Sequence, residues 1–449
     1  MASAAEQLAA NISFANFSKA TELKQRLWFT IGALIVYRLV TFVPLPGIDP
    51  NALQALFSQT QGGVLDFVNM FSGGALERMS IVALNIFPYI TSSIIIQLMT
   101  SLVPSLMALK KEGESGRKKL NQYTRYGTVL LTAIQGYGIA VGLEGWGAGQ
   151  GIAAVIDPGM FFRITTVITL VGGTLFLMWL GEQITSRGIG NGISLIIMSG
   201  IVARLPQAIG GLFEQGRTGA MSPIFIILII VVAFAVIAAI CFMERAQRRI
   251  LIQYPKRQIG NRVSQGESSH LPLKLNTSGV IAPIFASSLL LMPLTIAQFA
   301  GQNQGPDWLI TVTTALQHGA PLYMMLYAVG IVFFAFFYTA VVFNPEETAE
   351  NLKKQGGFIP GIRPGTRTAE YLDYVLTRIT VIGAGYLVLV CLLPEFLIAE
   401  LKVPFYFGGT SLLIVVNVTM DTVSQIQSHL IAHQYDGLIK KSKLRGGRR

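Results

Sequence analysis

Long apolar runs dominate this chain, and short polar segments separate them. A helix needs about 20 predominantly apolar residues to cross a lipid bilayer, and ten runs come close to that length. They cover residues 27–43, 80–103, 123–143, 161–181, 193–209, 223–243, 280–299, 322–343, 375–393 and 405–426. The fifth run is the weakest, because glycines interrupt it and it contains Arg204. The pattern predicts an all-α polytopic membrane protein with ten transmembrane helices.

One apolar segment is too short to cross a bilayer. It is lined with Phe67, Met70 and Phe71, and it ends at Gly73 and Gly74, just before the second span. An uncharged half-length helix of this kind fits a re-entrant position against an apolar lining, with the two glycines as a hinge. The alternative is a re-entrant helix that only fills a gap.

Lysine and arginine are concentrated in alternate connections between the spans. The two terminal segments and the connections that follow the second, sixth and eighth spans hold most of the 34 basic residues. By the positive-inside rule these segments are cytoplasmic, so both termini are expected in the cytoplasm. This topology explains most of the net charge of +11 without a nucleic-acid partner.

Ten spans divide into two halves of five, and an odd number per half requires the second half to be inverted, as in many transport proteins. Two cytoplasmic loops of about 30 residues each stand out, since loops that long usually carry a function. The expected units are an N-terminal segment (1–26), an N-terminal half (27–213), a C-terminal half (214–432) with loops at about 244–274 and 344–374, and a basic tail (433–449).

Candidate chemistry is sparse. The glycines of GIGNG lack the lysine of a phosphate-binding loop, so they indicate a helix break or close packing. His429 and His433 supply only two ligands, which makes a poor metal site, and neither cysteine suggests a disulfide. Only 13% of the residues are charged, against about 25% in soluble proteins, and this deficit indicates a polytopic membrane protein. The spans contain no pair of carboxylates that could act together in catalysis. We therefore predict no catalytic residue, no metal and no cofactor.

A secondary transporter with inverted repeats is the alternative function. Coupled transporters normally hold ionisable side chains near the middle of the membrane. The predicted spans are almost free of them, and Arg38 is the clearest exception, which could snorkel or pair. The spans instead contain amides and hydroxyls, which suit helix packing or a polar lining. This pattern disfavours the coupled transporter.

Ten segments in order through residues 22–435 resemble the SecY family, the pore subunits of the bacterial protein-translocation channel. They are FSGGALERMS, PYITSSIIIQLM, KKEGESGRKK, QYTRYGT, MWLGEQITSRGIGNGIS, ERAQRRI, HLPLK, FNPEETAENLKK, GFIPGIRPG and KVPFYFGGTSLLIVV. The resemblance implies two five-span halves around an hourglass pore and a passive channel for unfolded preproteins. It makes the short helix, roughly residues 64–74, a plug inside that pore.

The resemblance also implies where the pore closes and where it opens sideways. It assigns six side chains to an aliphatic constriction ring: Ile86, Ile90, Ile193, Ile197, Ile284 and Ile414. It places a lateral gate between spans two and three on one side and spans seven and eight on the other. Polar side chains assigned to that gate are Thr91, Asn276, Ser287 and Ser288.

The resemblance implies partners within the membrane and on the cytoplasmic loops. SecE and SecG are the expected small membrane subunits, and the SecA ATPase or the ribosome is expected to drive transport, so the chain itself is not an enzyme. The docking residues implied by the resemblance are Arg363, Lys256, Arg257 and Arg262, while Asn261 departs from the paired arginines of some members. Signal peptides, nascent chains and lipids are the other expected contacts, in the bacterial plasma (inner) membrane.

Overall fold

The structure is a computed structural model. It describes residues 21–59, 69, 71–145, 153–219, 222–255, 258–259, 262–263, 268–290, 315, 320–401 and 409–446. Helices account for most of this part of the chain. The longest of them coincide with the apolar runs of the sequence, which confirms the all-α class of the membrane-spanning part.

Each of the ten predicted spans overlaps a helix. The helices are α3 (Thr21–Val40), α4 (Pro50–Gln59), α6 (Phe87–Leu102), α7 (Pro104–Lys111), α8 (Glu114–Gly145), α9 (Met160–Arg187), α10 (Gly192–Arg217), α11 (Pro223–Arg245), a short apolar helix at Ile281–Leu290, α14 (Pro321–Val342), α15 (Pro345–Lys354), α16 (Thr366–Leu401) and α17 (Gly409–Gly446). Among the described residues, six helices are long and apolar enough to cross a membrane, or seven if the bent pair α6 and α7 is one span. The chain is therefore a polytopic membrane protein.

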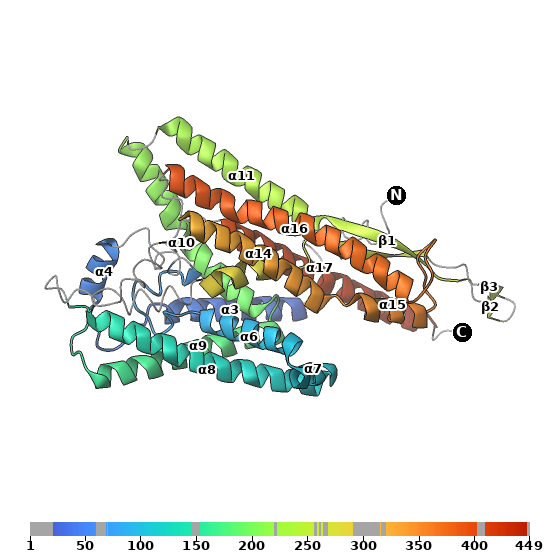
Figure 1. Cartoon of the computed structure of the whole chain (residues 1–449), viewed down its shortest axis with the longest axis horizontal. Helices are drawn as coiled ribbons and strands as arrows, with labels where there is room; N and C mark the ends of the chain where they lie inside the picture. Colours follow the sequence, from blue (N-terminus) through green and yellow to red (C-terminus); the bar gives the residue numbers. More distant parts are fainter. Residues whose placement is uncertain are drawn as a thin grey trace.

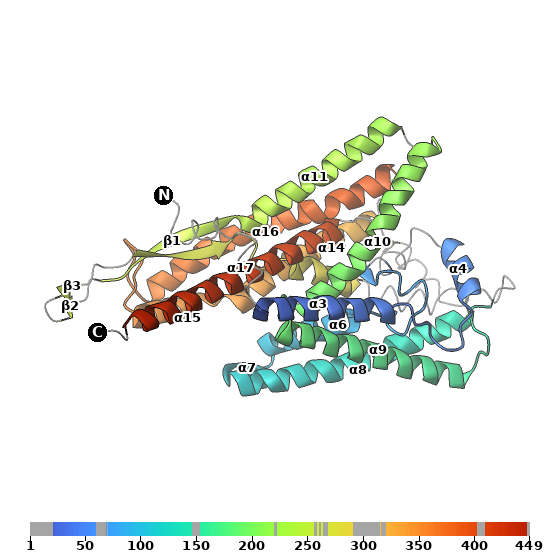
Figure 2. The same ribbon diagram turned by 180° about the vertical axis from the view of Figure 1, so that it is seen from behind.

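The helices form two groups, one from each half of the chain. In Figures 1 and 2, α6, α8 and α9 lie together on one side of the molecule, and α11, α14 and α16 lie on the other. Helix α9 contacts α3, α8 and α10, while α16 contacts α14 and α17. Contacts of α17 with α3 and α10 join the two groups. The functional site lies between them.

The second span begins later than the sequence predicts. Residues 72–86 form a series of turns, and α6 starts only at Phe87. Positive φ angles at Met79 (44°) and Asn85 (51°) are incompatible with a right-handed helix. The turns are fastened to the end of the first span, where the backbone N–H of Ile81 donates to the carbonyl of Val43 at 3.0 Å. A hydropathy pattern cannot distinguish such buried turns from helix, so the prediction of a span from residue 80 was wrong at its start.

The GIGNG segment interrupts the helical structure between α9 and α10, as the sequence predicts. The side chain of Asn191 caps the first turn of α10. The backbone N–H of Ile189 donates to the hydroxyl of Thr30 on α3 at 3.0 Å, and that of Gly190 donates to Gln425 Oε1 on α17 at 2.8 Å. This break is therefore also a joint between the two halves.

The long loop after α11 contains β-structure that the sequence analysis did not predict. Strand β1 (Gln247–Gln253) pairs antiparallel with β4 (Ser268–Lys274), and the two-residue strands β2 (Gln258–Ile259) and β3 (Arg262–Val263) pair beyond them. The β1–β4 pair projects from one end of the molecule, here called the ribbon end, while α4 lies at the opposite end, the α4 end (Figure 1).

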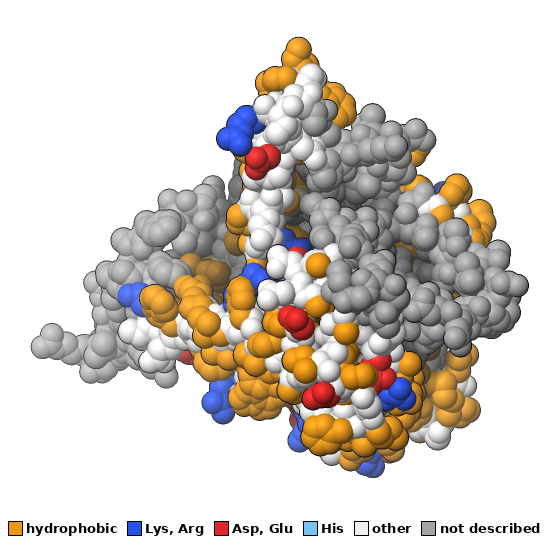
Figure 3. Space-filling model, turned by 90° about the vertical axis from the view of Figure 1, so that its left-hand side faces the viewer, with side chains coloured by type: hydrophobic (Ala, Val, Ile, Leu, Met, Phe, Trp, Pro, Cys, Tyr) orange, Lys and Arg blue, Asp and Glu red, His pale blue; other side chains and the backbone are white. Residues whose placement is uncertain are grey.

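The outer surface is apolar along the helices. On α11, Ile224 is 80% exposed and Phe242 is 74% exposed. Figure 3 looks at the α4 end, where hydrophobic side chains gather on the lower part of the face and charged side chains are few and scattered. Soluble proteins rarely leave such helices open to water, so the sides of these helices suit contact with lipid or with membrane-spanning partners.

Close helix contacts at glycine provide a test of the fold. A Cβ atom on Gly173 of α9 would collide with the carbonyl oxygen of Ile81, whereas one on Gly172 would meet nothing within 4 Å. We expect Gly173→Val to lower the free energy of unfolding by about 1–3 kcal/mol through overpacking. Gly172→Val is the matched control, since it makes the same change in helix propensity. Thermal unfolding in detergent measures both, and equal midpoints would contradict the packing seen here.

Candidate pore and docking platform

The two helix groups meet at a very small apolar cavity. Its volume is about 10 Å³, and the lining residues are Phe71, Asn85, Ile86, Phe87, Ile90, Ile197, Ile284 and Ser287. A single water molecule needs roughly this much space and several polar partners. Among the described residues its walls are mostly aliphatic and aromatic, a lining that disfavours water.

Four of the six side chains predicted for the constriction ring line this cavity. Ile86 and Ile90 come from the start of α6, Ile197 from α10 and Ile284 from the helix Ile281–Leu290. All four are at least 92% buried. The other two do not line this cavity: Ile414 belongs to the same hydrophobic core, and the partly buried Ile193 packs against that core.

The predicted plug reaches the cavity through Phe71. Its side chain is 3% exposed and packs edge-to-face on Phe87, with 5.8 Å between the ring centroids. The side-chain amide of Asn85 donates to the carbonyl oxygen of Phe71 at 3.0 Å. Phe67 and Met70 lie outside the described residues. The part of the plug that the structure describes is thus held by both apolar and polar contacts.

The predicted hinge at Gly73 and Gly74 has a backbone conformation that glycine adopts more readily than other residues. Gly73 and Gly74 have φ angles of 66° and 85°, a region that side chains disfavour. The Gly73 carbonyl accepts hydrogen bonds from Arg38 Nη1 at 2.7 Å and Arg78 Nη2 at 3.1 Å. Arg38 therefore pairs with the plug backbone, one of the two roles expected for it. A Cβ at Gly200 of α10 would collide with the Phe71 carbonyl, so the plug backbone lies directly on α10.

Three polar side chains near the hinge were missed by the sequence analysis. Arg204 of α10 bonds Glu77 Oε2 at 2.6 Å, and Asn69 Nδ2 donates to the same oxygen at 3.1 Å. The sequence analysis treated Arg204 only as a weakness of the fifth span. Its partner lies 127 residues away along the chain, so no local pattern reveals the pair.

The described parts of the two long loops that were predicted to be cytoplasmic form one body at the ribbon end, here called the platform (the described residues within 247–274, and residues 343–379). Gln253 and Phe358 exchange both backbone hydrogen bonds, at 2.9 and 3.0 Å. A separate hydrophobic core lies beneath them, formed by Ile250, Leu273, Ile359, Leu372, Val375, Leu376 and Ile379. The ribbon and the loop before α16 are therefore positioned together.

Comparisons with known proteins agree with this geometry. The sequence profile of the SecY family matches residues 80–423. Protein translocase subunit SecY of Vibrio cholerae is 57% identical over 432 residues, covering 96% of each chain. Its counterpart in Escherichia coli strain K12 is 56% identical over 425 residues, covering 95% of this chain and 96% of that one.

The chain belongs to the SecY family. Solved structures show the same fold at low sequence identity. One described as a protein-conducting channel has a TM-score of 0.65 at 16% identity, covering 91% of this chain and 92% of that one. Sec61 from a canine ribosome–channel complex has a TM-score of 0.63 at 16% identity with the same coverage.

The helices predicted to form the lateral gate are arranged here as two pairs. Helices α6 and α8 are joined where Ser92 Oγ donates to the carbonyl of Thr124 at 2.8 Å. The helix Ile281–Leu290 packs on α14 through Phe285 and Phe334, whose ring centroids are 5.7 Å apart. The small cavity lies where these two pairs meet.

The polar side chains assigned to the gate occupy different places. Ser287 lines the cavity and donates to the carbonyl of Ile284 at 2.9 Å. Thr91 and Ser288 are buried, and the Thr91 hydroxyl bonds within its own helix. Asn276 lies at the root of the ribbon instead, where its amide donates to Glu244 Oε1 at 2.6 Å.

Of the four predicted docking residues, Arg363 is the best placed. It is exposed at a loop tip between Gly361 and Gly365, which have φ angles of 83° and 109°. Arg262 lies in β3, and Lys256 and Arg257 fall outside the described residues. The structure thus presents one of these cations on a shaped turn of the platform.

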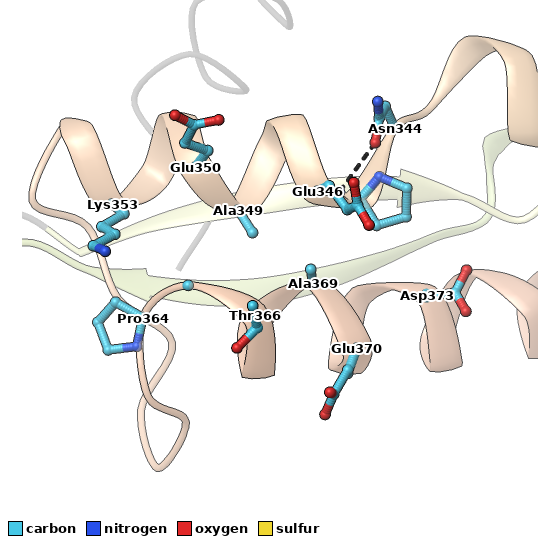
Figure 4. Close-up of a pocket in the computed structure, with 12 residues that line it drawn as sticks. Asn344, Glu346, Ala349, Glu350, Lys353, Pro364, Thr366, Ala369, Glu370 and Asp373 are labelled. Carbon is cyan, nitrogen blue, oxygen red and sulfur yellow. Dashed lines mark hydrogen bonds between the residues drawn. The ribbon is translucent and has the colours of Figure 1, made fainter.

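A groove of about 1070 Å³ lies beside this turn, between α15 and the start of α16. Figure 4 shows Ala349 and Ala369 facing each other across it, while Glu350 and Glu370 point away in opposite directions. The side chain of Asn344 caps α15 by accepting a hydrogen bond from the backbone N–H of Glu346 at 3.1 Å. The groove therefore has alanines at its centre and charged side chains at its edges.

The platform core can be tested apart from the pore. Leu372 is fully buried in it, whereas the neighbouring Asp373 is exposed. We expect Leu372→Ala to lower local stability by about 2–5 kcal/mol, because it leaves a cavity, and so to speed trypsin cleavage in both loops. Asp373→Ala should leave the cleavage rate unchanged. If Leu372→Ala changed the rate in only one loop, the two loops would not form one body.

Proposed function

We propose that this chain is the central pore subunit of a protein translocase, a passive channel for unfolded preproteins in the bacterial plasma (inner) membrane. The observation that carries the proposal is the closed apolar constriction between two helix groups, with Phe71 of a hinged segment packed into it. Family membership and the shared channel fold support it. In this orientation the ribbon end and both termini face the cytoplasm, in keeping with the positive-inside rule.

An apolar constriction suits the transport of many different sequences. Aliphatic side chains exclude ions by dewetting, so a seal needs no charged gate. They also offer a moving polypeptide no hydrogen bond to hold it. Ile86, Ile90, Ile197 and Ile284 would form this seal, and displacement of the plug would open it. Ile193 and Ile414 would join the ring only in a different arrangement of the helices.

Membrane segments would leave the channel sideways, through the seam between the two helix pairs. Phe87 and Ile90 on one side and Ile284 and Ser287 on the other meet at this seam. Such side-chain contacts separate without breaking any helix. A signal sequence with ten central leucine-like residues gains about 3–6 kcal/mol on entering lipid. This gain would sort signals from ordinary chain without catalysis.

Transport would be driven by a partner on the platform, either SecA or a ribosome. The exposed Arg363 and the basic ribbon suit such docking, and contact with ribosomal RNA would weaken as salt rises. SecE and SecG are the proposed membrane subunits, and the apolar surface of α11 offers room for a partner helix. ATP hydrolysis would belong to SecA.

The alternative, a coupled transporter, finds little support at the constriction. Such proteins bind ions or substrates through charged or strongly polar groups near the middle of the membrane. Asn85 and Ser287 are the two polar side chains that line the cavity, and neither is ionisable. The Ser287 hydroxyl and the amide nitrogen of Asn85 donate to the carbonyls of Ile284 and Phe71, while Asn85 Oδ1 has no hydrogen-bond partner among the described residues.

Shortening the ring side chains tests the seal. We expect glycine at Ile86, Ile90, Ile197 and Ile284, introduced singly and in pairs, to raise ion leak during translocation, because water gains continuous space through the constriction. Conductance across planar bilayers containing the purified translocase measures this leak. Ile189→Gly, which alters a buried isoleucine away from the cavity, is the control. Unchanged leak in every ring variant would place the seal elsewhere.

Reversing one platform charge tests docking. We expect Arg363→Glu to abolish partner-driven export while the protein stays folded, since the side chain is exposed and makes no ion pair among the described residues. Arg367→Glu is the control, because Arg367 is also exposed but pairs with Glu370. Export into membrane vesicles is measured for both. Normal export by Arg363→Glu would remove its docking role.

A further inference from the structure

Asn69 and Glu77 bridge the two sides of the glycine hinge. Asn69 precedes Gly73 and Gly74, and Glu77 follows them. The amide of Asn69 donates to Glu77 Oε2 at 3.1 Å, and the backbone N–H of Glu77 donates back to Asn69 Oδ1 at 3.0 Å. Asn69 is 2% exposed. The plug cannot rotate far about the glycines while both bonds remain.

Arg204 fixes this bridge to the body of the protein. Its guanidinium bonds Glu77 Oε2 at 2.6 Å, and its side chain is 18% exposed. Arg204 lies on α10, a helix that is capped and joined to both halves of the chain. A charge-assisted hydrogen bond of this length is stronger than a neutral one. Glu77 is therefore held between a fixed helix and the plug.

A second arginine holds the hinge itself. Arg38 of α3 donates to the carbonyl of Gly73 at 2.7 Å. A cavity of about 450 Å³ lies beside the hinge, lined by Arg38, Gly73, Glu77 and Arg204 and by residues of α4. These polar contacts therefore lie toward the α4 end, on the side of the plug away from the ribbon. The apolar contacts of Phe71 lie on the constriction.

We propose that Asn69, Glu77 and Arg204 form a clasp, a set of positioning residues that locks the hinge and determines how readily the plug leaves the constriction. This inference rests on the proposed role of the plug and deepens it. Apolar contact alone would seal the pore, but it is non-directional and does not fix the orientation of the plug. The clasp supplies a directional interaction that must break before the hinge can turn, and water in the adjoining cavity could then solvate the freed groups.

The clasp can be measured through a reporter inside the plug. Ser72 is fully buried, so a Ser72→Cys variant should react with a membrane-impermeant maleimide only when the plug moves. The complete translocase, reconstituted in phospholipid vesicles, is treated from the α4 end. The parent protein with its two natural cysteines gives the background rate. Resting ion conductance in planar bilayers is recorded in parallel.

Breaking the clasp should expose the reporter. We expect Arg204→Gln and Glu77→Ala each to raise the labelling rate about tenfold, since each removes the anchored carboxylate contact. Asn69→Ala should do the same while leaving the ion pair in place, so the proposal stays testable if an arginine variant folds poorly. The control is Arg217→Gln on the same helix, whose ion pair with Glu214 is exposed.

Charge exchange separates a specific pair from general damage. The double variant Glu77→Arg with Arg204→Glu should return the labelling rate to within about threefold of the parent, because the attraction is restored with opposite polarity. Labelling by Arg204→Gln and Asn69→Ala at the rate of the Arg217→Gln control would overturn the clasp. Deleting residues 64–74 keeps the two proposals apart. If the deletion variant conducts ions at rest and the clasp variants label at the control rate, only the clasp proposal is contradicted. If the deletion variant does not conduct ions, the proposed role of the plug is contradicted.

Discussion

The structure depends on the exclusion of water between two helix groups that must also be able to separate. At their meeting point, Phe71 and four isoleucines leave a cavity of only about 10 Å³. Apolar contact has no preferred direction, so it seals well and yields in shape when something larger enters. In the proposed channel this contact, rather than a charged gate, would close the path, so the surrounding helices can be ordinary membrane helices.

Irregular backbone inside a membrane protein requires internal hydrogen bonds. Residues 72–86 are not helical, so their carbonyls and that of Phe71 lack the partners a continuing helix would supply. Asn85 and Arg38 provide two of them, at Phe71 and Gly73. Such side-chain bonds can be exchanged for water one at a time, unlike the hydrogen bonds of a helix. This arrangement would keep the proposed plug stable at rest and still able to move, and the proposed clasp would act on that balance.

Hydropathy was enough to locate the spans, because each apolar run overlaps a helix. It failed at residues 80–86, since buried turns and buried helix have the same composition. The ribbon was missed because the short alternation around Ile250 and Ile252 lies in a very basic loop. The ring isoleucines resemble any residues facing lipid, so only the family resemblance selected them. The pairing of Glu77 with Arg204 left no signal, because it depends on how distant segments fold together.

The platform and the constriction are separated by very little chain. Strand β4 ends at Lys274, Asn276 lies two residues later, and the helix that carries Ile284 begins at Ile281. The bond from Asn276 to Glu244 ties this junction to the end of α11, and the backbone N–H of Leu275 donates to Ala246 at 3.0 Å. Hydrogen bonds thus join the start of β1 to the end of β4. A movement of the platform would therefore be passed through a short junction to the helix Ile281–Leu290. A partner that binds only the platform is therefore mechanically close to the seal.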